Sequence, residues 1–309
     1  MQNKTQDIMI KGNIFNIIRC SLNDGYGIRT VVYFKGCNLR CKWCHNPEGL
    51  TAKRQIMFYA HKCINCGRCI DICPKLCHKM DNGMHIINFK NCILCGKCVE
   101  ICPDNALQLM GKEYLAEELL AEINKDKAYY FETGGVTFSG GECLLQIDFL
   151  QEILYLCKEK GINTALETAI SVPWENIERI LPLVDMFIVD LKIMDSEIHK
   201  KYIGKDNFLI LENIKKLSYE HNNIRIRIPL IPQINDNDDN LTKSCEFINS
   251  IGSGIKEIEL LKYNNLAESK YKAIDIPYTV FSKESQNDID YKKKKDICRT
   301  ILNNNIKVI

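Results

Sequence analysis

The stretch Cys37-Asn38-Leu39-Arg40-Cys41-Lys42-Trp43-Cys44, here termed the cluster loop, spaces three cysteines as C-x3-C-x2-C. Three thiolates on one short loop can bind three irons of a [4Fe–4S] cube, whereas clusters that only carry electrons usually have four cysteine ligands. The fourth iron is then open to a substrate or cofactor, as one position of a catalytic zinc is. Trp43 adds a flat apolar surface beside such a cluster. The spacing predicts a catalytic [4Fe–4S] site on Cys37, Cys41 and Cys44.

A structural zinc site and a chance cluster of buried thiols are the alternatives for this loop. Tetrahedral zinc needs a fourth Cys or His ligand, and no second C-x2-C or H/C pair near the loop completes one. His45 directly follows Cys44, which is a poor position for closing a tetrahedron. We therefore favour the iron–sulfur interpretation of the cluster loop.

A second cysteine-rich segment follows, and it is an internal repeat. Both copies read C-x2-C-x2-C-x3-C-P, the run of bacterial two-cluster ferredoxins, in which the fourth cysteine of each copy binds the other copy's cluster. On that pattern one cluster is held by Cys63, Cys66, Cys69 and Cys102, and the other by Cys73, Cys92, Cys95 and Cys98. Structural zinc would instead predict C-x2-C pairs separated by a longer loop. The segment therefore predicts two further [4Fe–4S] clusters.

The composition limits the possible classes of protein. Cysteine accounts for 17 of the 309 residues, and outside the secretory pathway such thiols indicate metal binding rather than disulfides. The segment Met1–Asp7 is polar and lacks the apolar core of a signal peptide, and no stretch approaches a membrane span. The net charge of +2 argues against a nucleic-acid partner. Because exposed clusters are damaged by oxygen, we expect a cytoplasmic protein of an anaerobe.

Beyond the cysteine motifs, short β-branched strands alternate with amphipathic helices. The predicted strands are 30–34, 135–139, 162–168, 186–191, 224–231 and 255–261, and the clearest helix runs from Leu145 to Lys160 before Gly161. This alternation predicts βαβ units and a parallel sheet. About six units are too few for a closed eight-stranded barrel. The fold class expected is therefore α/β, a partial (β/α)6 TIM-like barrel.

The cysteine repeat interrupts this pattern and is expected to be an inserted module. We predict that residues 1–51 begin the barrel, residues 52–111 form a ferredoxin-like two-cluster insert, and residues 112–309 complete the barrel. In such barrels the chemistry lies at the carboxyl ends of the strands. The residues at or just past those ends are Cys37, Glu142, Glu167, Asp190 and Lys192.

Together these residues resemble the glycyl radical enzyme activating enzymes, which are radical S-adenosylmethionine (SAM) enzymes. The matching motifs are the cluster loop, Asp24-Gly25-Tyr26-Gly27-Ile28-Arg29-Thr30, Trp43-Cys44-His45-Asn46, Ser139-Gly140-Gly141-Glu142 and Asp190-Leu191-Lys192. The similarity covers nearly the whole chain. The insert resembles that of the subgroup serving glycerol or propanediol dehydratase, choline lyase, hydroxyproline dehydratase and the arylacetate decarboxylases, whereas the pyruvate formate-lyase activating enzyme lacks it.

The resemblance implies that SAM chelates the open iron through its amino and carboxylate groups. In this family the stretch 139–142 contacts the amino group, and Gly140 and Gly141 let the backbone approach without a Cβ in the way. Asp190 and Lys192 alternate on one strand, so both can face the barrel interior, where Lys192 can donate to the cofactor's carboxylate or ribose. An internal salt bridge between these two residues is the alternative.

Three other positions are expected near the cofactor. Arg227 faces the interior if Ile226 and Ile228 face the helices, and could then hold the SAM carboxylate or the partner peptide. Asn264 stands where the family has a histidine, so that contact must come from Asn264 or be lost. Glu167 replaces an aspartate that helps to bind a monovalent cation, which we therefore expect near Glu167. The full set of expected cofactor-binding residues is Trp43, His45, Gly140, Gly141, Glu142, Asp190, Lys192, Arg227 and Asn264.

The function implied by the resemblance is that of a radical activase. One electron from the reduced cluster would cleave SAM to methionine and a 5′-deoxyadenosyl radical, which removes a hydrogen atom from a glycine of a partner. The expected partners are a glycyl radical enzyme and a low-potential reductant such as ferredoxin or flavodoxin.

Two alternatives stay open at this point. A radical SAM enzyme with auxiliary clusters could modify a small molecule or a peptide, although its extra clusters usually follow the barrel. A pure electron carrier would leave about 200 barrel residues and the cluster loop unexplained. The sequence names neither the activated enzyme nor the role of the two inserted clusters.

Overall fold

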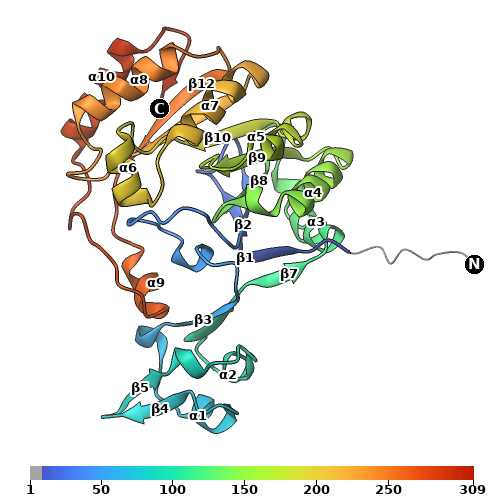
Figure 1. The fold of residues 1–309 in the computed structure, drawn as a ribbon. Helices are drawn as coiled ribbons and strands as arrows, with labels where there is room; N and C mark the ends of the chain where they lie inside the picture. The colour runs from blue at the N-terminus through green and yellow to red at the C-terminus, as the bar shows by residue number, and fades with distance from the viewer. Residues whose placement is uncertain (1–8) are drawn as a thin grey trace, which may run out of the picture.

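Nine strands form one sheet in the larger part of the chain, in the order β13-β12-β11-β10-β9-β8-β2-β1-β7 (Figure 1). Their bounds are β1 Gly12–Ser21, β2 Arg29–Phe34, β7 Lys112–Tyr114, β8 Gly135–Gly140, β9 Asn163–Thr168, β10 Met186–Asp190, β11 Ile224–Pro229, β12 Ile255–Leu261 and β13 Lys307–Val308. The computed structural model describes residues 9–309, so the segment Met1–Asp7 lies outside the described residues. Neighbouring strands from β2 to β13 are parallel.

The six strands predicted from the sequence are all present and lie side by side in chain order, from β2 to β12. The α/β fold with a mainly parallel sheet is therefore confirmed. Three strands of this sheet were not predicted. β1 and β7 form an antiparallel edge beside β2, and β13 has only two residues.

The sheet is strongly curved. Strands β2 and β11 are four strand spacings apart, about 19 Å in a flat sheet. Nevertheless, residues just before β2 contact side chains of β11: the Arg225 guanidinium lies 5.0 Å from the Tyr26 ring, and Arg227 donates to the carbonyl of Asn23. The strands therefore curl round a common interior, as in a partial barrel.

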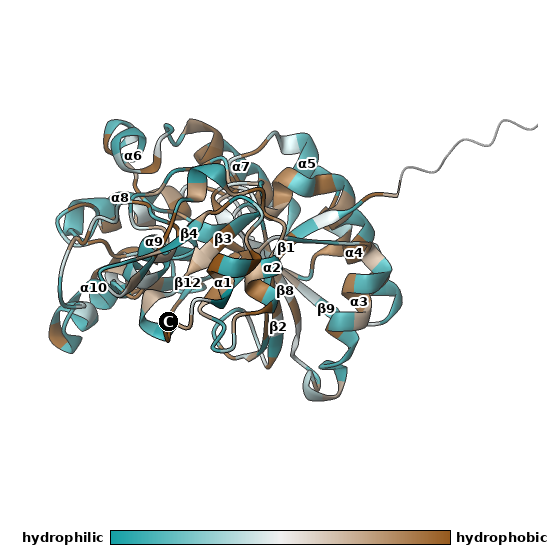
Figure 2. Ribbon diagram, turned by 90° about the horizontal axis from the view of Figure 1, so that it is seen from below, coloured by the Kyte–Doolittle hydropathy of each residue, from teal (hydrophilic) through white to brown (hydrophobic). Residues whose placement is uncertain are grey.

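The two faces of the sheet differ in chemistry. Alternate residues, such as Val32, Phe138 and Ile226, pack against the helices in the main hydrophobic core. The intervening residues face the interior, where charged side chains such as Glu167 and Arg227 meet. The helices that pack in this core are α3 Ala116–Asn124, α4 Ile147–Glu159, α5 Trp174–Glu178, α7 Phe208–Glu220, α8 Asp238–Asn249 and α10 Asp288–Ile301. Helix α6 Ser196–Ile203 packs instead beside the cluster loop, and α9 Glu268–Ala273 lies against the strand Gln55–Phe58. Figure 2 shows hydrophobic and hydrophilic segments alternating along helices such as α4.

Local sequence explains where these helices begin and end. The apolar residues of α4, among them Phe149 and Ile153, recur at helical spacing and are fully buried. The predicted helix starts later than expected, at Ile147, because Cys143–Gln146 form a 3-10 turn first. In α6 the side chain of Asp195 caps the start by accepting from Ile198 N.

The segment 55–110, which falls within the predicted insert, forms a separate lobe below the barrel (Figure 1). Its elements are β3 Gln55–Phe58, α1 Arg68–Ile72, β4 His78–Asp81, β5 Met84–Ile87, α2 Lys97–Glu100 and β6 Leu107–Met110. β3 and β6 pair antiparallel, with Gln55 opposite Met110, so the chain enters and leaves the lobe at one narrow neck. Lys35 of the barrel secures the neck by donating to Gln55 Oε1 at 3.1 Å.

Candidate active site at the barrel mouth

A cavity of about 360 Å³ lies at the carboxyl ends of the barrel strands. Pockets of this size are typical for cofactors and small ligands. Eleven of the residues singled out from the sequence line it: Cys37, Cys41, Trp43, Cys44, His45, Gly140, Gly141, Glu167, Asp190, Lys192 and Asn264. Segments that are far apart in the sequence thus converge on one site.

The cluster loop is held against helix α6. Arg40 N donates to Ile203 O at 2.8 Å, which fixes the loop backbone to the end of the helix. The buried ring of Trp43 packs against Tyr202 and Phe281, with ring centroids 6.5 and 6.0 Å away. Trp43 therefore belongs to an apolar wall of the cavity and supports the loop from behind.

The three thiols of the loop lie in an environment that disfavours their charged form. Burial raises the pKa of Cys37 to about 11 and that of Cys44 to about 12, and it also raises the pKa of Cys41. Without metal these thiols are protonated at neutral pH. Binding iron as thiolates therefore releases protons, as is usual for cysteine sites.

Gly140 and Gly141 allow two backbone segments to touch. Gly140 has a φ of +121°, and a Cβ there would lie 2.2 Å from Phe34 N. A Cβ on Gly141 would lie 2.3 Å from Gly36 O. Both glycines are thus required by contact with β2 and the start of the cluster loop. The approach of a cofactor, the reason expected from the sequence, stays a prediction beside this packing requirement.

Asp190 and Lys192 form an ion pair on the cavity wall. Lys192 Nζ donates to Asp190 Oδ2 at 2.5 Å. Burial alone would lower the pKa of Lys192, but Asp190 and the Cys41 sulfur raise it well above its ordinary value. The salt bridge considered as an alternative is therefore present, inside the cavity. Because an ammonium carries three N–H donors, Lys192 keeps donors for a ligand as well.

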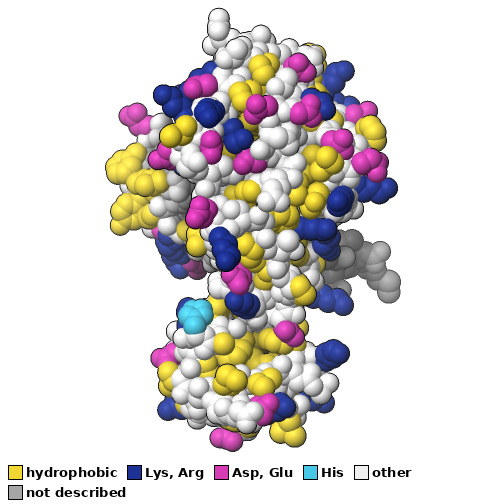
Figure 3. Space-filling model, turned by 90° about the vertical axis from the view of Figure 1, so that its left-hand side faces the viewer, with side chains coloured by type: hydrophobic (Ala, Val, Ile, Leu, Met, Phe, Trp, Pro, Cys, Tyr) yellow, Lys and Arg dark blue, Asp and Glu magenta, His cyan; other side chains and the backbone are white. Residues whose placement is uncertain are grey.

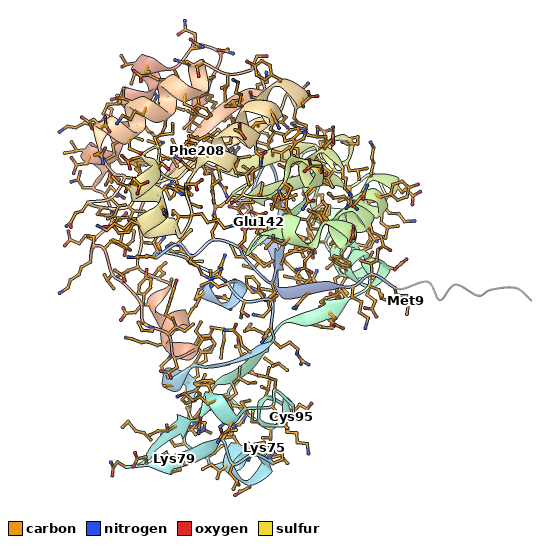
Figure 4. The ribbon with its side chains drawn as sticks, viewed as in Figure 1. Met9, Lys75, Lys79, Cys95, Glu142 and Phe208 are labelled. Carbon is orange, nitrogen blue, oxygen red and sulfur yellow. The ribbon has the colours of Figure 1, made fainter. Side chains whose placement is uncertain are left out.

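Glu142 is engaged by the protein rather than exposed to the cavity. Its carboxylate accepts from Thr168 Oγ1 at 2.7 Å, from Ala169 N at 3.1 Å and from Leu144 N at 3.3 Å. In Figure 4 Glu142 lies beside the loop that follows β8. The side chain joins the ends of β8 and β9, and its direct contact with a cofactor stays a prediction.

Arg227 faces the interior as expected, because Ile226 and Ile228 pack among the helices. Its guanidinium contacts Glu167 Oε1 at 2.5 Å and Glu259 Oε2 at 2.8 Å. Burial would lower the pKa of Arg227, but these carboxylates raise it above its ordinary value. Arg227 is not among the residues that line the cavity. Its contact with cofactor or peptide therefore stays a prediction, and its visible role is to balance buried carboxylates.

Another wall of the cavity is formed by His45 and Asn264. His45 Nε2 lies 3.2 Å from the backbone oxygen of Asn264, and burial lowers the pKa of His45. The Asn264 side-chain oxygen accepts from Leu266 N at 3.2 Å. From α9, Lys270 Nζ contacts the backbone oxygen of His45 at 3.0 Å and Glu48 Oε1 at 2.7 Å. The C-terminal part of the chain thus holds the end of the cluster loop.

Two smaller cavities in the insert bring its cysteines together. The first, termed the Cys63 site, is lined by Cys63, Cys66, Cys69 and Cys102. The second, termed the Cys92 site, is lined by Cys73, Cys92, Cys95 and Cys98, with Cys77 beside them. These are the two sets of four expected from the repeat pattern. The first cysteine of each repeat accepts a hydrogen bond from a backbone N–H. Asn65 N donates to Cys63 Sγ and Leu94 N donates to Cys92 Sγ, both at 3.4 Å.

Comparison with known protein families identifies the superfamily to which the barrel and the cluster loop belong. A family model described as "Radical SAM superfamily" matches residues 31–245, a range that contains the cluster loop, the insert and strands β8 to β11. The chain belongs to the radical SAM superfamily.

Curated relatives narrow the assignment within this superfamily. The chain is 42% identical over 274 residues to the (2S)-3-sulfopropanediol dehydratase activating enzyme of Klebsiella oxytoca, covering 86% of each chain. It is 44% identical over 266 residues to the trans-4-hydroxy-L-proline dehydratase activating enzyme of Clostridioides difficile, covering 84% of this chain and 87% of that protein. The choline trimethylamine-lyase activating enzyme of Oleidesulfovibrio alaskensis is 36% identical over 289 residues, covering 92% of this chain and 93% of that protein. The chain is therefore a radical SAM enzyme of the glycyl radical enzyme activating family, as its motifs predicted.

A solved structure shows the same fold at low identity. The crystal structure of Streptococcus suis SuiB bound to precursor peptide SuiA aligns with a TM-score of 0.54 and 13% identity, covering 90% of this chain and 48% of that one. This likeness concerns the fold alone. No helix in residues 9–309 combines the length and the apolar composition needed to cross a bilayer.

Several other residues of this cavity were not predicted as site residues. They are Leu39, Asn46, Ser139, Thr168, Ala169, Pro229, Ile231, Leu261, Lys262 and Tyr263. Most of them lie at or just past the carboxyl end of a strand, so their position was a usable signal. What the sequence does not contain is how far the sheet curls, which decides whether residues after β11 and β12 reach the cluster loop.

Proposed function

We propose that Cys37, Cys41 and Cys44 hold the catalytic [4Fe–4S] cluster and that SAM binds beside it in the same cavity. The observation that carries the proposal is that these three thiols share one cavity with Gly140 and the Asp190–Lys192 pair. A cluster and SAM bound there supply the electron transfer and bond cleavage that produce the radical for the partner's glycine. The donor set fits this pair of groups, because it offers three sulfur ligands and a buried ammonium.

The residues around the cavity have distinct tasks in this proposal. Lys192 donates to the carboxylate or ribose of SAM, and Asp190 holds its ammonium on the interior face. The end of β8, around Gly140, presents backbone groups to the amino end of the cofactor. The buried rings of Trp43 and Tyr263 belong to one hydrophobic cluster beside the thiols, which excludes water and competing hydrogen donors.

The insert is proposed to hold two further [4Fe–4S] clusters, one in the Cys63 site and one in the Cys92 site. Support comes from the four cysteines that line each cavity. Further support comes from the backbone, since Asn65 and Leu94 take left-handed φ values of 56° and 57° at equivalent points of the two loops. Non-glycine residues adopt such conformations at a cost, and they concentrate at functional sites.

The protein substrate is proposed to be a glycyl radical enzyme, and the electron donor a low-potential ferredoxin or flavodoxin in the cytoplasm. The relatives are named for activating a sulfopropanediol dehydratase, a hydroxyproline dehydratase and a choline lyase. Because this chain resembles all three to a similar degree, the class of partner follows and the individual partner does not.

A monovalent cation near Glu167 is the least supported part of the proposal. Arg227 contacts one carboxylate oxygen of Glu167, and Ser139 Oγ donates to the other at 2.5 Å. A cation would have to displace or share one of these contacts. SAM binding measured in potassium, sodium and tetramethylammonium buffers tests this point: equal affinity in all three would remove the cation from the proposal.

The decisive experiment tests a candidate glycyl radical enzyme as the partner. Reduced, iron-loaded protein, SAM and that partner are mixed without oxygen, and an electron paramagnetic resonance doublet is expected on the partner. Replacing the radical-bearing glycine by alanine should remove the signal. If SAM is consumed while the modification appears on a small molecule or a peptide, the alternative radical SAM function is correct instead.

A further inference from the structure

The two halves of the insert are related by a pseudo-twofold repeat. Cys63 and Cys92 are 29 residues apart, and the same offset relates β3 to β5 and β4 to β6. The strand pairing obeys it as well: Phe58 lies opposite Leu107 in one ladder, and His78 lies opposite Ile87 in the other. Each residue of one half therefore has a structural counterpart in the other.

Two buried positions break this symmetry. His85 is the counterpart of Ile56, and His78 is the counterpart of Leu107. All four side chains are at most 8% exposed. His85 lines the Cys63 site as Ile56 lines the Cys92 site, while His78 lines the Cys92 site as Leu107 lines the Cys63 site. One half thus has a polar pair where the other has an aliphatic pair.

The histidine pair contacts the sulfur ligands of only one site. His85 Nε2 lies 3.4 Å from Cys69 Sγ, and His85 Nδ1 lies 3.8 Å from Cys63 Sγ. His78 Nδ1 lies 2.9 Å from His85 Nε2, and the two rings stack with centroids 5.0 Å apart. The counterpart of His85 at the Cys92 site is Ile56, whose side chain has no donor.

Both neutral tautomers of His85 place an N–H within reach of a cysteine sulfur. With the proton on Nδ1, the ring donates toward Cys63 and accepts from His78. With the proton on Nε2, that N–H lies within reach of both Cys69 Sγ and His78 Nδ1. A thiolate ligand can only accept, so the contact with His85 stabilises negative charge on the sulfurs.

We propose that His85, oriented by His78, is a second-sphere hydrogen-bond donor that makes the cluster of the Cys63 site easier to reduce than the cluster of the Cys92 site. The inference rests on the proposed function, because it requires both clusters in the insert. Hydrogen bonds to the sulfurs are an established determinant of cluster potential. Taking up one electron adds negative charge to the cube, so a donor present at one site only separates the two potentials.

The repeat supplies the matched variants for a test. The full chain, with Cys37, Cys41 and Cys44 replaced by alanine to remove the barrel cluster, is loaded with iron and sulfide. Its two remaining midpoint potentials are measured by a mediated titration with dithionite, followed by electron paramagnetic resonance. His85→Ile gives the Cys63 site the aliphatic residue found at the equivalent position of the Cys92 site. Ile56→His gives the Cys92 site the histidine found at the Cys63 site. His78→Leu removes only the residue that orients His85.

His85→Ile should lower the higher potential and leave the other in place, and we expect at least a tenfold change in the reduction equilibrium, about 59 mV for one electron. Ile56→His should raise the lower potential, and His78→Leu should cause a smaller shift than His85→Ile. If both clusters are present but neither potential moves in His85→Ile, the inference is wrong. An iron content below about eight per chain in the parent would instead overturn the proposed clusters.

The same histidines could serve a different purpose, which this experiment also detects. Ligand atoms of Cys69, His78 and His85 lie within 4.8 Å of one another, a spacing that suits a single metal ion. If one zinc per chain is bound in the parent and lost in His85→Ile, the pair is a metal site and the hydrogen-bond assignment fails.

Discussion

The barrel and the insert both gather cysteines, yet they do so by different means. In the barrel, segments far apart in the sequence pack on an extensive apolar core, and the cluster loop lies where that packing leaves a cavity. In the insert, the described hydrophobic cluster has only three buried members: Ile56, Cys98 and Leu107. Figure 3 shows many of the insert's hydrophobic side chains on its surface. We therefore predict that the barrel folds without its cluster, whereas the insert depends on its two proposed clusters to stay folded.

Removing iron is the strongest way to challenge this contrast. A lobe of about 60 residues with so small a core buries too little apolar surface to fold without metal or another staple. After chelation we expect residues 52–111 to lose nearly all protection from amide hydrogen exchange, while strands β8 to β11 keep theirs. Exchange read out by mass spectrometry compares the two regions in one sample. Retained protection in the metal-free insert would contradict the contrast.

Single cysteine replacements should separate the regions functionally. Cys41→Ala should abolish SAM cleavage and leave about eight of about twelve irons, because the insert uses other ligands. Cys98→Ala should instead remove iron from the insert and leave the barrel cluster able to bind SAM. Iron content and SAM cleavage are measured on the same preparations. Cys20→Ala, at an exposed cysteine of β1, is the control and should change neither quantity.

The charges of the barrel interior should matter for the barrel alone. Arg227→Met leaves Glu167 and Glu259 without their shared cation, and breaking a buried pair in this way costs about 3–5 kcal/mol. Both tryptophans, Trp43 and Trp174, lie in the barrel, so urea unfolding followed by tryptophan fluorescence reports on that region. Unchanged barrel stability would show that solvent already reaches these carboxylates.

Arg227→Met should also reverse the way in which the stability of the barrel depends on pH. Burial raises the pKa of Glu167, but Arg227 and Ser139 bring it below its ordinary value of 4.5. In the native protein this carboxylate therefore stabilises the fold above pH 4.5, and the stabilisation is lost as the pH falls further. In Arg227→Met burial dominates and the pKa rises, so stability should increase as the pH is lowered from neutrality toward 5. Unfolding curves at several pH values measure the sign.

Lys192 should give the smallest effect, confined to the cofactor. Lys192→Ala removes a charge-assisted donor worth about 1.5–3 kcal/mol, so SAM affinity should fall about tenfold to a hundredfold without loss of iron. Equilibrium dialysis with labelled SAM measures the affinity. Lys243→Ala, which breaks an exposed ion pair with Asp239, serves as the control. If Lys192→Ala changes only stability, the pair with Asp190 has a structural role alone.

The sequence was most informative where residues of one chemical type recur at a regular spacing. The cluster loop, the two sets of insert cysteines and six parallel strands could be predicted, because thiol spacing and alternating apolar patterns are local properties. Glu142 is a residue whose contacts could not be predicted from the sequence. Its place after a strand suggested a cavity residue, but three donors from β9 and the 3-10 turn take up its carboxylate. Which hydrogen-bond partner reaches a polar group depends on packing between segments that are distant in the sequence. Local sequence patterns do not contain this information.

The histidine pair was missed for another reason. His78 and His85 lie seven residues apart in a short hairpin, and neither is adjacent to a cysteine motif. Only alignment of the two repeat halves makes them stand out, since the counterparts Ile56 and Leu107 are aliphatic. A comparison of the repeat with itself, residue by residue, would have found them from the sequence.

The narrow neck of the insert also has an evolutionary consequence. Gln55 and Met110 face each other across the β3–β6 ladder, so everything between them can be removed or acquired as one cassette without moving the barrel. A deletion that joins these two strands through a short turn leaves both ends where they were. A single genetic event at this neck would therefore add or remove the whole cysteine-rich lobe and leave the barrel strands as they are.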